Sequence, residues 1–303
     1  MPENKILVIR GGAIGDFILT LPVLAALRRQ FPESRLEVLG YPHIARLAVA
    51  GGLADDARPI ESRALAGFFA RDGELDGALK DYFASFSIIL SFLYDPDGIF
   101  QANVARFSRA QFIVGPHRPD DRAGIHATEV FLKPLERLAI FEADPVPRLS
   151  LNSGPSAFNQ LALHPGSGSE RKNWPEARWS KLLRWLAAET SWPLLLVGGE
   201  AEGDRLSRLT QGMASGRCEI LACQPLPEVA RRLATCAAFV GHDSGISHLA
   251  AAVGLPGITL WGDSAAAVWR PRSDRFQVIQ ALGERESLTV EELVVAIRAL
   301  PMG

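Results

Sequence analysis

Short apolar runs alternate with amphipathic stretches through the first half of the chain. The apolar runs are continuous, which is typical of strands buried on both faces of a parallel sheet. The pattern predicts strands near Ile6–Arg10, Leu36–Gly40, Ala57–Ile60, Ile88–Phe92 and Phe112–Gly115. It predicts helices between them, near Ile14–Gln30, Ile44–Ala50, Glu74–Phe83, Phe100–Phe107 and Thr128–Ile140.

Residues 142–159 interrupt this pattern. The segment contains Pro145, Pro147, Gly154 and Pro155 and has little periodicity, as expected of a linker. A second alternating series follows, with strands predicted near Leu161–His164, Pro193–Val197, Cys218–Leu221, Ala238–Val240, Ile258–Trp261 and Phe276–Ile279. Its predicted helices lie near Glu176–Glu189, Glu202–Met213, Leu226–Thr235, Gly245–Val253 and Val290–Leu300.

The two series predict two α/β domains, residues 1–150 and residues 151–303, each built on a doubly wound parallel sheet. Sheets of this kind bind ligands beyond the carboxyl ends of their strands. We therefore expect the site in a cleft between two facing sheets. The last helix is expected either in the C-terminal core or packed back on the N-terminal domain.

The composition narrows the class of protein. The 303 residues are 48% hydrophobic with a formal net charge of −2, which lacks the basic excess of a nucleic-acid-binding protein. The spacing of Cys218, Cys223 and Cys236 matches neither a metal site nor a disulfide framework, so we expect reduced, mostly buried thiols in a cytoplasmic protein. The opening run Lys5–Ile9 has no basic segment before it, and no apolar run reaches the ~18 residues of a spanning helix. We expect neither a signal peptide nor a membrane span.

The turn at 241–248 is the strongest candidate for a binding site. It connects an apolar run to a helix-prone run, and the first turn of a helix carries unpaired N–H groups and partial positive charge. Such a turn binds phosphate readily. Ser244 adds a hydroxyl, Gly245 allows close approach of the backbone, and Asp243 can accept from hydroxyl groups. His248 either reaches a phosphate or fixes the turn.

A second turn follows the first predicted strand. Gly11, Gly12 and Gly15 let the backbone turn tightly and approach a ligand. A dinucleotide fingerprint would need a glycine where Arg10 stands, and no Gly-Lys-Ser/Thr follows as in a Walker A loop. Asp16, where the first helix begins, is either an acid favoured by the helix N-terminus or a general base.

A third turn follows His164, which we interpret as a packed histidine at a strand end. Gly166 and Ser167 allow backbone groups to donate to a phosphate, and Lys172 supplies a point charge. The alternative is a basic surface loop without a ligand.

Two pairs of acidic residues complete the candidates. Glu200 follows two glycines at a strand end and could accept from a ribose diol, with Glu202 as its competitor and an ordinary solvated glutamate as the alternative. Asp95 and Asp97 imitate a metal-binding DxD pair, but the proline between them argues against that role.

In combination these motifs resemble glycosyltransferase family 9, the ADP-heptose:lipopolysaccharide heptosyltransferase family. The resemblance is carried, in order and nearly end to end, by Arg10–Asp16 with Thr20–Pro22, by His164–Ser167 with Lys172–Pro175, and by Asp243–His248. It implies a GT-B fold, with two Rossmann-like domains that bind the acceptor and the nucleotide sugar respectively. It also implies an inverting transfer with no metal and no cofactor.

The resemblance also implies roles for single residues. Asp16 matches the catalytic base, and Lys172 matches the residue that contacts the diphosphate. The implied nucleotide-sugar site comprises Gly166, Ser167, Lys172, Glu200, Asp243, Ser244, Gly245 and His248. The implied donor is ADP-linked, and the implied acceptor is a lipopolysaccharide or other glycan at the cytoplasmic face of the inner membrane. Candidate membrane-docking residues, otherwise ordinary solvated charges, are Arg63, Arg71, Lys80, Arg106 and Arg109.

Departures from the family leave part of the function open. The first domain is short, and the acceptor-facing stretch from Tyr94 to His126 contains an unusual Asp95–Gly98 segment, so the acceptor and the sugar stay open. A sugar-nucleotide epimerase of the same architecture is an alternative, although it needs further acid and base groups. A protein that binds a nucleotide sugar without catalysis is another. The failed fingerprint disfavours a dehydrogenase.

Overall fold

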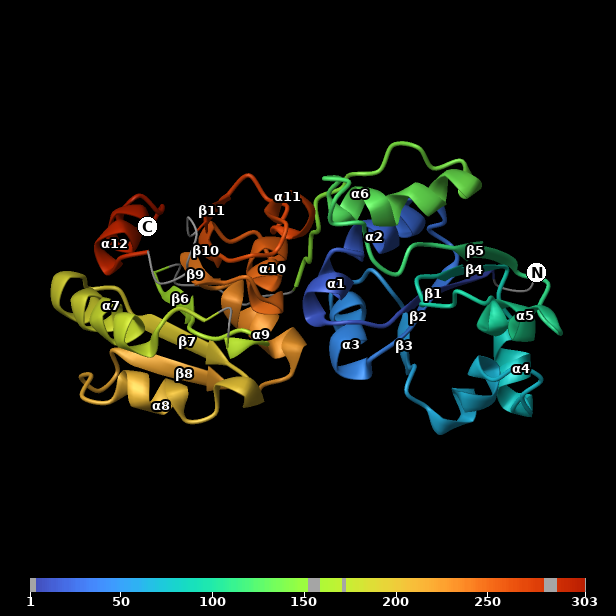
Figure 1. The fold of residues 1–303 in the computed structure, drawn as a ribbon, viewed down its shortest axis with the longest axis horizontal. Coiled ribbons are helices and arrows are strands. Elements are labelled where there is room, and N and C mark those ends of the chain that lie inside the picture. Colours follow the sequence, from blue (N-terminus) through green and yellow to red (C-terminus); the bar gives the residue numbers. More distant parts are fainter. Residues whose placement is uncertain (1–3, 152–158, 171–172, 281–287, 303) are drawn as a thin grey trace. The chain divides into compact units, whose positions relative to one another are not determined.

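The structure is a computed structural model that describes residues 4–151, 159–170, 173–280 and 288–302. It divides into two compact units, Met1–Pro147 and Arg148–Gly303. Within each unit, every strand pair of the described residues is parallel, and helical segments connect the strands (Figure 1). The doubly wound α/β prediction is confirmed for both units.

The sheet of the first unit has the strand order β3-β2-β1-β4-β5. The chain winds outward from β1 in one direction and then returns to add β4 on its other side, so the winding reverses between β1 and β4. The strands are β1 (Lys5–Arg10), β2 (Arg35–Gly40), β3 (Asp56–Pro59), β4 (Ile88–Ser91) and β5 (Gln111–Val114). The helices are α1 (Ile14–Ile18), α2 (Leu21–Gln30), α3 (Pro42–Ala50), α4 (Gly77–Ala84), α5 (Ile99–Ala105) and α6 (Ala127–Leu132), with 3₁₀ helices η1 (Arg63–Phe69) and η2 (Lys133–Leu138).

Three predicted helices are wrong as single elements. The predicted helix at 14–30 is α1 and α2, because Pro22 has no N–H to donate and would clash with the carbonyl four residues earlier. Pro134 acts in the same way on the predicted helix at 128–140, whose second half is the 3₁₀ helix η2. Gly203, at φ +46°, separates the predicted helix at 202–213 into a 3₁₀ turn and a shorter α-helix.

The core of the first unit is rich in phenylalanine. Phe68 of η1, Phe83 of α4 and Phe100 of α5 pack against strand residues such as Leu7 and Ile89. The ring centroids of Phe68 and Phe83 are 5.0 Å apart, and those of Phe83 and Phe100 are 5.8 Å apart. Aromatic packing of this kind holds the helices on the sheet.

The sheet of the second unit has the order β11-β10-β9-β6-β7-β8, so its winding reverses between β6 and β9. Its strands are β6 (Leu161–His164), β7 (Leu194–Gly198), β8 (Cys218–Ala222), β9 (Ala238–His242), β10 (Gly257–Trp261) and β11 (Phe276–Gln280). Its helices are α7 (Glu176–Glu189), α8 (Arg205–Thr210), α9 (Leu226–Leu233), α10 (Gly245–Ala252), α11 (Ala266–Trp269) and α12 (Val290–Arg298), with the 3₁₀ turn η4 (Glu200–Glu202).

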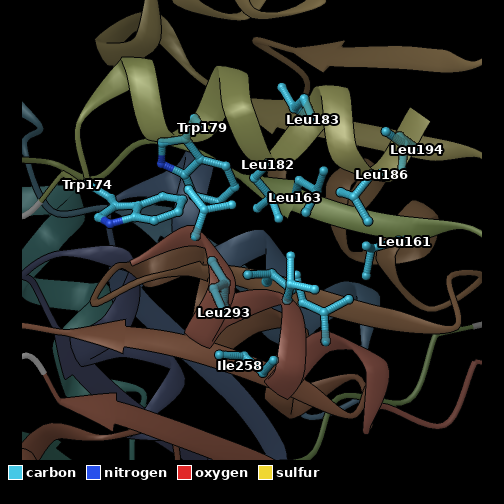
Figure 2. Packing of buried hydrophobic residues seen from close by; sticks show 14 of the residues in the cluster. Leu161, Leu163, Trp174, Trp179, Leu182, Leu183, Leu186, Leu194, Ile258 and Leu293 are labelled. Carbon is cyan, nitrogen blue, oxygen red and sulfur yellow. The ribbon is translucent and has the colours of Figure 1, made fainter. Parts of the chain in front are cut away.

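The core of the second unit lies between α7, α12 and the sheet. Figure 2 shows Trp179, Leu182 and Leu186 of α7 directed toward strand residues, with Trp174 beside Trp179. Leu293 of α12 is fully buried in the same cluster, and α12 contacts α7. Of the two arrangements expected for the last helix, the described residues therefore show packing in the C-terminal core.

The three cysteines are free, but the expectation that they are mostly buried is wrong. Cys236 is buried, Cys218 is half-buried and Cys223 is exposed. Cys223 lies just past the end of β8 at φ +53°, where the chain turns outward, and this removes its side chain from the core. Burial raises the pKa of Cys236 to about 12 and that of Cys218 to about 11, which keeps both thiols protonated at neutral pH.

Candidate functional site

The turn after β1 places Asp16 at the carboxyl edge of the first sheet. Asp16 is in the first turn of α1, where its Oδ2 accepts a hydrogen bond of 3.1 Å from the backbone N–H of Ala13. Gly12 has φ +100°, and a Cβ there would lie 3.2 Å from Asp16 Oδ2. The backbone conformation thus favours glycine, and a Cβ would also press on the Asp16 carboxylate. The side chain of Asp16 is 30% exposed and can meet a ligand.

Arg10, the last residue of β1, connects Asp16 to the rest of this edge. Its guanidinium is 3% exposed and lies 3.6 Å from Asp16 Oδ1. It donates a 2.8 Å hydrogen bond to the carbonyl of His117 and lies 4.4 Å from the centre of the Phe131 ring. Burial lowers the pKa of Arg10 to about 10, while the charge of Asp16 acts in the opposite direction. Arg10 is therefore still a cation at neutral pH and orients the carboxylate.

An exposed aromatic pair lies at the same edge of the sheet. Tyr94 follows β4 and is 71% exposed, and its ring centroid is 4.6 Å from that of His117, which follows β5. Since Arg10 binds the carbonyl of His117, a short chain of contacts joins this pair to Asp16. The sequence places Tyr94 in the acceptor-facing stretch but gives no sign of its pairing with a residue on the next strand.

Asp95 and Asp97 have different surroundings in the structure. The two carboxylate oxygens of Asp95 accept hydrogen bonds from the backbone N–H groups of Phe100 and Gln101, at 3.2 and 3.1 Å, at the start of α5. Asp97 is exposed. The resemblance to a DxD pair therefore reflects a helix cap. Among the described residues, no cluster of His, Cys, Asp and Glu could hold a metal ion.

The turn after β6 brings Gly166 and Ser167 to the carboxyl edge of the second sheet. A Cβ on Gly166 would lie 1.9 Å from Glu202 Oε1, so any larger residue requires Glu202 or the loop to move. Ser167 is 6% exposed, and its hydroxyl donates to the carbonyl of Ser169 at 2.7 Å. Lys172, predicted to contact a diphosphate, lies outside the described residues.

The turn after β7 distinguishes the two candidate glutamates. Glu202 is 7% exposed, and its Oε2 accepts a 2.6 Å hydrogen bond from the backbone N–H of Gly199. Its carboxylate is thus used inside the turn. Glu200 is exposed, so of the two it is the residue that can accept from a ribose.

The turn after β9 has the geometry expected of an anion site. Ser244 is the N-cap of α10, and its hydroxyl accepts from the N–H of Ser247 at 3.4 Å. Gly245 begins the helix, where N–H groups have no partner within the helix. Asp243 is 9% exposed and accepts a 2.5 Å hydrogen bond from the hydroxyl of Ser264. His248 is 6% exposed and lies one turn into the helix.

His164 is a packed histidine, as the sequence analysis predicts. It is 4% exposed, and its Nδ1 is 2.8 Å from the carbonyl oxygen of Val197, so Nδ1 must donate. Burial lowers the pKa of His164, although the hydrogen bond acts in the opposite direction. The neutral form is therefore favoured.

A cavity of about 630 Å³ lies at the opposite edge of the second sheet. Its lining includes Ala237, Pro256 and Arg275, which directly precede β9, β10 and β11. It is thus at the amino ends of the strands, whereas doubly wound sheets bind ligands at the carboxyl ends. The cavity is separate from the candidate site.

No helix in the described part of the chain is both long and apolar enough to span a bilayer.

Within each unit, the structure places predicted site residues at the point where the winding of the sheet reverses. Asp16 and the glycines at 11, 12 and 15 lie where the winding of the first sheet reverses. Gly166, Asp243, Ser244 and Gly245 lie where the winding of the second sheet reverses, between β6 and β9. Reversal points are where doubly wound proteins bind nucleotides and related ligands. Neither Arg10 nor His242 has a role that the sequence predicts, since a charged or polar residue at a strand end carries no signal of its distant partners.

Comparisons with known proteins agree with this architecture. The family model described as Glycosyltransferase family 9 (heptosyltransferase) matches residues 147–295. Lipopolysaccharide heptosyltransferase 1 of Escherichia coli K12 is 40% identical over 91 residues, a segment that covers 30% of this chain and 28% of that protein. Lipopolysaccharide heptosyltransferase 3 of Escherichia coli is 23% identical over 319 residues, which cover 92% of this chain and 89% of the relative.

Solved structures extend the similarity to the fold of both units. The E. coli heptosyltransferase WaaC with ADP has a TM-score of 0.77 at 20% identity, covering 97% of this chain and 99% of that one. The family 9 glycosyl transferase from Veillonella parvula has a TM-score of 0.78 at 15% identity, covering 99% of this chain and 98% of that one. The protein thus has the GT-B fold, with two parallel-sheet α/β domains. In sequence, the chain is similar to glycosyltransferase family 9 over residues 147–295.

Proposed function

We propose that this protein is an inverting, metal-independent glycosyltransferase that transfers heptose from ADP-heptose to a hydroxyl of a lipopolysaccharide core or related glycan. The observation that carries the proposal is the placement of a carboxylate held by a buried cation at the reversal point of one sheet, and of an amide-rich turn at that of the other. The residues 1–150 would bind the acceptor, and the residues 151–303 would bind the donor. The ADP in the similar WaaC structure supports the choice of nucleotide.

The transfer forms one bond and breaks one bond at the anomeric carbon. The acceptor oxygen attacks from the face opposite the diphosphate, the bond from carbon to the phosphate oxygen breaks, and Asp16 takes the hydroxyl proton. Arg10 holds the Asp16 carboxylate toward the acceptor. Negative charge grows on the leaving diphosphate, and the N-terminus of α10, with Ser244 and Gly245, stabilises it together with Lys172. Such preorganised donors act mainly in the transition state.

The acceptor side of the proposal includes Tyr94. An exposed tyrosine ring presents a flat apolar face and a polar tip, which suits a sugar ring with hydroxyl groups at its rim. Its contact with His117 fixes the orientation of the ring. We therefore assign Tyr94 to the acceptor subsite. Glu200 would accept from the ribose of the donor.

The proposal also places the protein at the inner face of the cytoplasmic membrane. Arg63, Arg71, Arg106 and Arg109 are exposed on the first unit, Lys80 is half-buried, and Phe69 is 45% exposed between the first two arginines. Cations near an apolar ring suit the surface of an anionic bilayer. Binding to anionic vesicles that weakens in high salt would support this placement, and equal binding to neutral vesicles would contradict it.

The proposal is tested by incubating the protein with ADP-heptose and with a heptose-deficient lipopolysaccharide core, and by measuring ADP release and the glycan product. Formation of a product with inverted anomeric configuration, also in the presence of a chelator, is expected. An isomerised nucleotide sugar without transfer would instead indicate an epimerase. Tight ADP binding without any turnover over a panel of acceptors would indicate a binding protein.

A further inference from the structure

His242 is the last residue of β9 and is 1% exposed. It directly precedes the turn at Asp243 and Ser244, and it lies where the winding of the second sheet reverses. The mechanism above does not use it. A histidine with so little contact with solvent must satisfy both ring nitrogens within the protein.

Both ring nitrogens have a partner in the loop that follows β6. Nε2 is 2.8 Å from the backbone nitrogen of Trp174, and Nδ1 is 3.1 Å from the carbonyl oxygen of Gly166. The Trp174 N–H can only donate, so Nε2 must be the unprotonated acceptor. The Gly166 carbonyl can only accept, so Nδ1 must carry the proton. The geometry thus requires a neutral imidazole in the Nδ1–H tautomer.

The two partners flank one segment of chain. Gly166 lies at its start and Trp174 at its end, and the single imidazole connects them across the segment. The hydrogen bonds given for the described residues between them are local: Ser167 and Ser169 bond each other, and the Asn173 N–H donates to the Glu170 carbonyl. His242 is therefore the described contact that ties both ends of this loop to the sheet.

The imidazole is itself fixed by its surroundings. Its ring packs edge-on against Trp179, with centroids 5.5 Å apart and planes at 80°. Trp179 meets Trp174 in the same manner at 5.5 Å, and the Trp174 indole donates to the carbonyl of Leu288 at 3.1 Å. Figure 2 shows the two indoles side by side at the end of the core cluster. The end of the loop is thus attached to the hydrophobic core.

The other end of the loop is attached to the turn after β7. Gly166 lies so close to Glu202 that a Cβ would not fit, and Glu202 in turn accepts from the Gly199 N–H. Turns from β6, β7 and β9 therefore form one hydrogen-bonded and packed unit, with His242 connecting the two strands at the reversal point.

We propose that His242 is a positioning residue that holds Gly166 and Trp174 in place, at the two described ends of the loop after β6, for binding of the donor diphosphate. The inference rests on the proposed function and deepens it. His242 acts through the loop, so its loss should weaken nucleotide binding more than it weakens the fold. An open loop must be ordered at the moment of binding, and that ordering subtracts from the affinity.

The test compares three variants of His242, with ADP as the probe. In His242→Asn the amide nitrogen takes the place of Nδ1 and keeps the bond to Gly166. In His242→Gln the amide oxygen takes the place of Nε2 and keeps the bond to Trp174. His242→Phe keeps neither. Calorimetric titration should show ADP affinity lowered by about tenfold or more for the phenylalanine variant, with the other two between it and the wild type.

His164 provides the matched control, because it is also a buried histidine at a strand end, on the adjacent strand β6. Its Nδ1 contacts Val197 and not the loop. His164→Phe should lower the melting temperature and leave ADP affinity within about twofold of the wild type. If His242 had a purely structural role, His242→Phe would also lower the melting temperature and leave ADP affinity unchanged. Equal ADP affinity of His242→Phe and wild type therefore overturns the inference.

Two further readouts keep the outcomes distinct. If His242→Phe does not fold, the asparagine and glutamine variants decide, and wild-type ADP affinity in both overturns the inference. Nitrogen-15 spectra of the histidine side chains should show an Nδ1–H tautomer that disappears in the His242 variants, and an Nε2–H tautomer at His242 overturns it. A wild-type protein that binds none of ADP, GDP and UDP overturns the proposed function itself, and the inference with it.

Discussion

The carboxyl edges of the two sheets are built from different chemistry. At the first edge, the buried cation of Arg10 lies 3.6 Å from the carboxylate of Asp16. At the second edge, the described groups at the reversal point are largely neutral: glycine backbone, serine hydroxyls and the imidazole of His242, with Asp243 bound to a hydroxyl. The same topology therefore carries a charged pair in one unit and an array of dipoles in the other.

This difference in charge fits the state that each edge must keep while no ligand is bound. A carboxylate that accepts a proton must be charged when the site is empty, and a partly buried charge needs a counter-ion throughout. A turn that binds a phosphate can instead use N–H groups that water satisfies while the site is empty. Under the proposed function, the first edge would accept the proton and the second edge would bind the anion.

The largest effect should come from Asp16→Asn. The amide keeps the shape of the side chain but cannot accept a proton, so initial transfer rates should fall about 10²- to 10⁴-fold, while ADP affinity measured by calorimetry stays unchanged. Asp76→Asn is the control, because Asp76 caps α4 through the Leu79 N–H and asparagine caps equally well. A loss of ADP affinity with normal turnover in Asp16→Asn would reverse the assignment of the two edges.

The next largest effect, on stability and on ADP affinity, should come from Gly166→Ala. The new methyl group would lie 1.9 Å from Glu202 Oε1, so the loop or the glutamate must move, at a cost of about 1–3 kcal/mol in unfolding free energy. ADP affinity should fall as well. Gly168→Ala is the control, because a Cβ there meets no atom within 4 Å. Equal stability and ADP affinity in the two variants would show that this packing does not shape the loop.

A smaller effect is expected for Tyr94→Ala at the first edge. Removing a stacked ring should raise the KM for the acceptor about 2- to 10-fold, with kcat and ADP affinity nearly unchanged. Phe141 provides the matched control, since it is 73% exposed but lies beyond the last helical segment of the first unit. A rise in acceptor KM in Phe141→Ala of the same size would remove Tyr94 from the acceptor subsite.

The last prediction concerns how the stability of the second unit depends on pH. Burial holds the pKa of His164 below its ordinary value of 6.5, so below that pH the unfolded chain takes up a proton that the folded chain does not. Stability should therefore fall as the pH is lowered from 7 to 5, by at most about 2 kcal/mol from this residue. His164→Asn should reduce the fall in chemical denaturation experiments. An unchanged slope would mean that His164 is not neutral in the folded state.

Local pattern was sufficient for the strands and for the class of fold. Buried parallel strands are continuous apolar runs, and strands such as β1 and β6 end where the polar and glycine-rich turns begin. Helix continuity was harder to predict. Thr20 and Pro22 interrupt an apolar pattern that otherwise continues to Gln30, because a hydrophobic period does not report the loss of a backbone donor.

The sequence by itself determined which residue types stand at the strand ends, and so which turns could bind an anion or carry a base. Only the tertiary structure decided which of those turns meet. Arg10 reaches His117 across 107 positions, and His242 reaches Gly166 across 76, because the strand order places β5 one strand beyond β4 from β1, and β6 beside β9. It also showed that Glu202 and Asp95 are used by the backbone. Local periodicity predicts whether a segment is a helix or a strand, but it does not predict which segments pack beside it. Contacts between distant segments depend on the packing of the whole sheet.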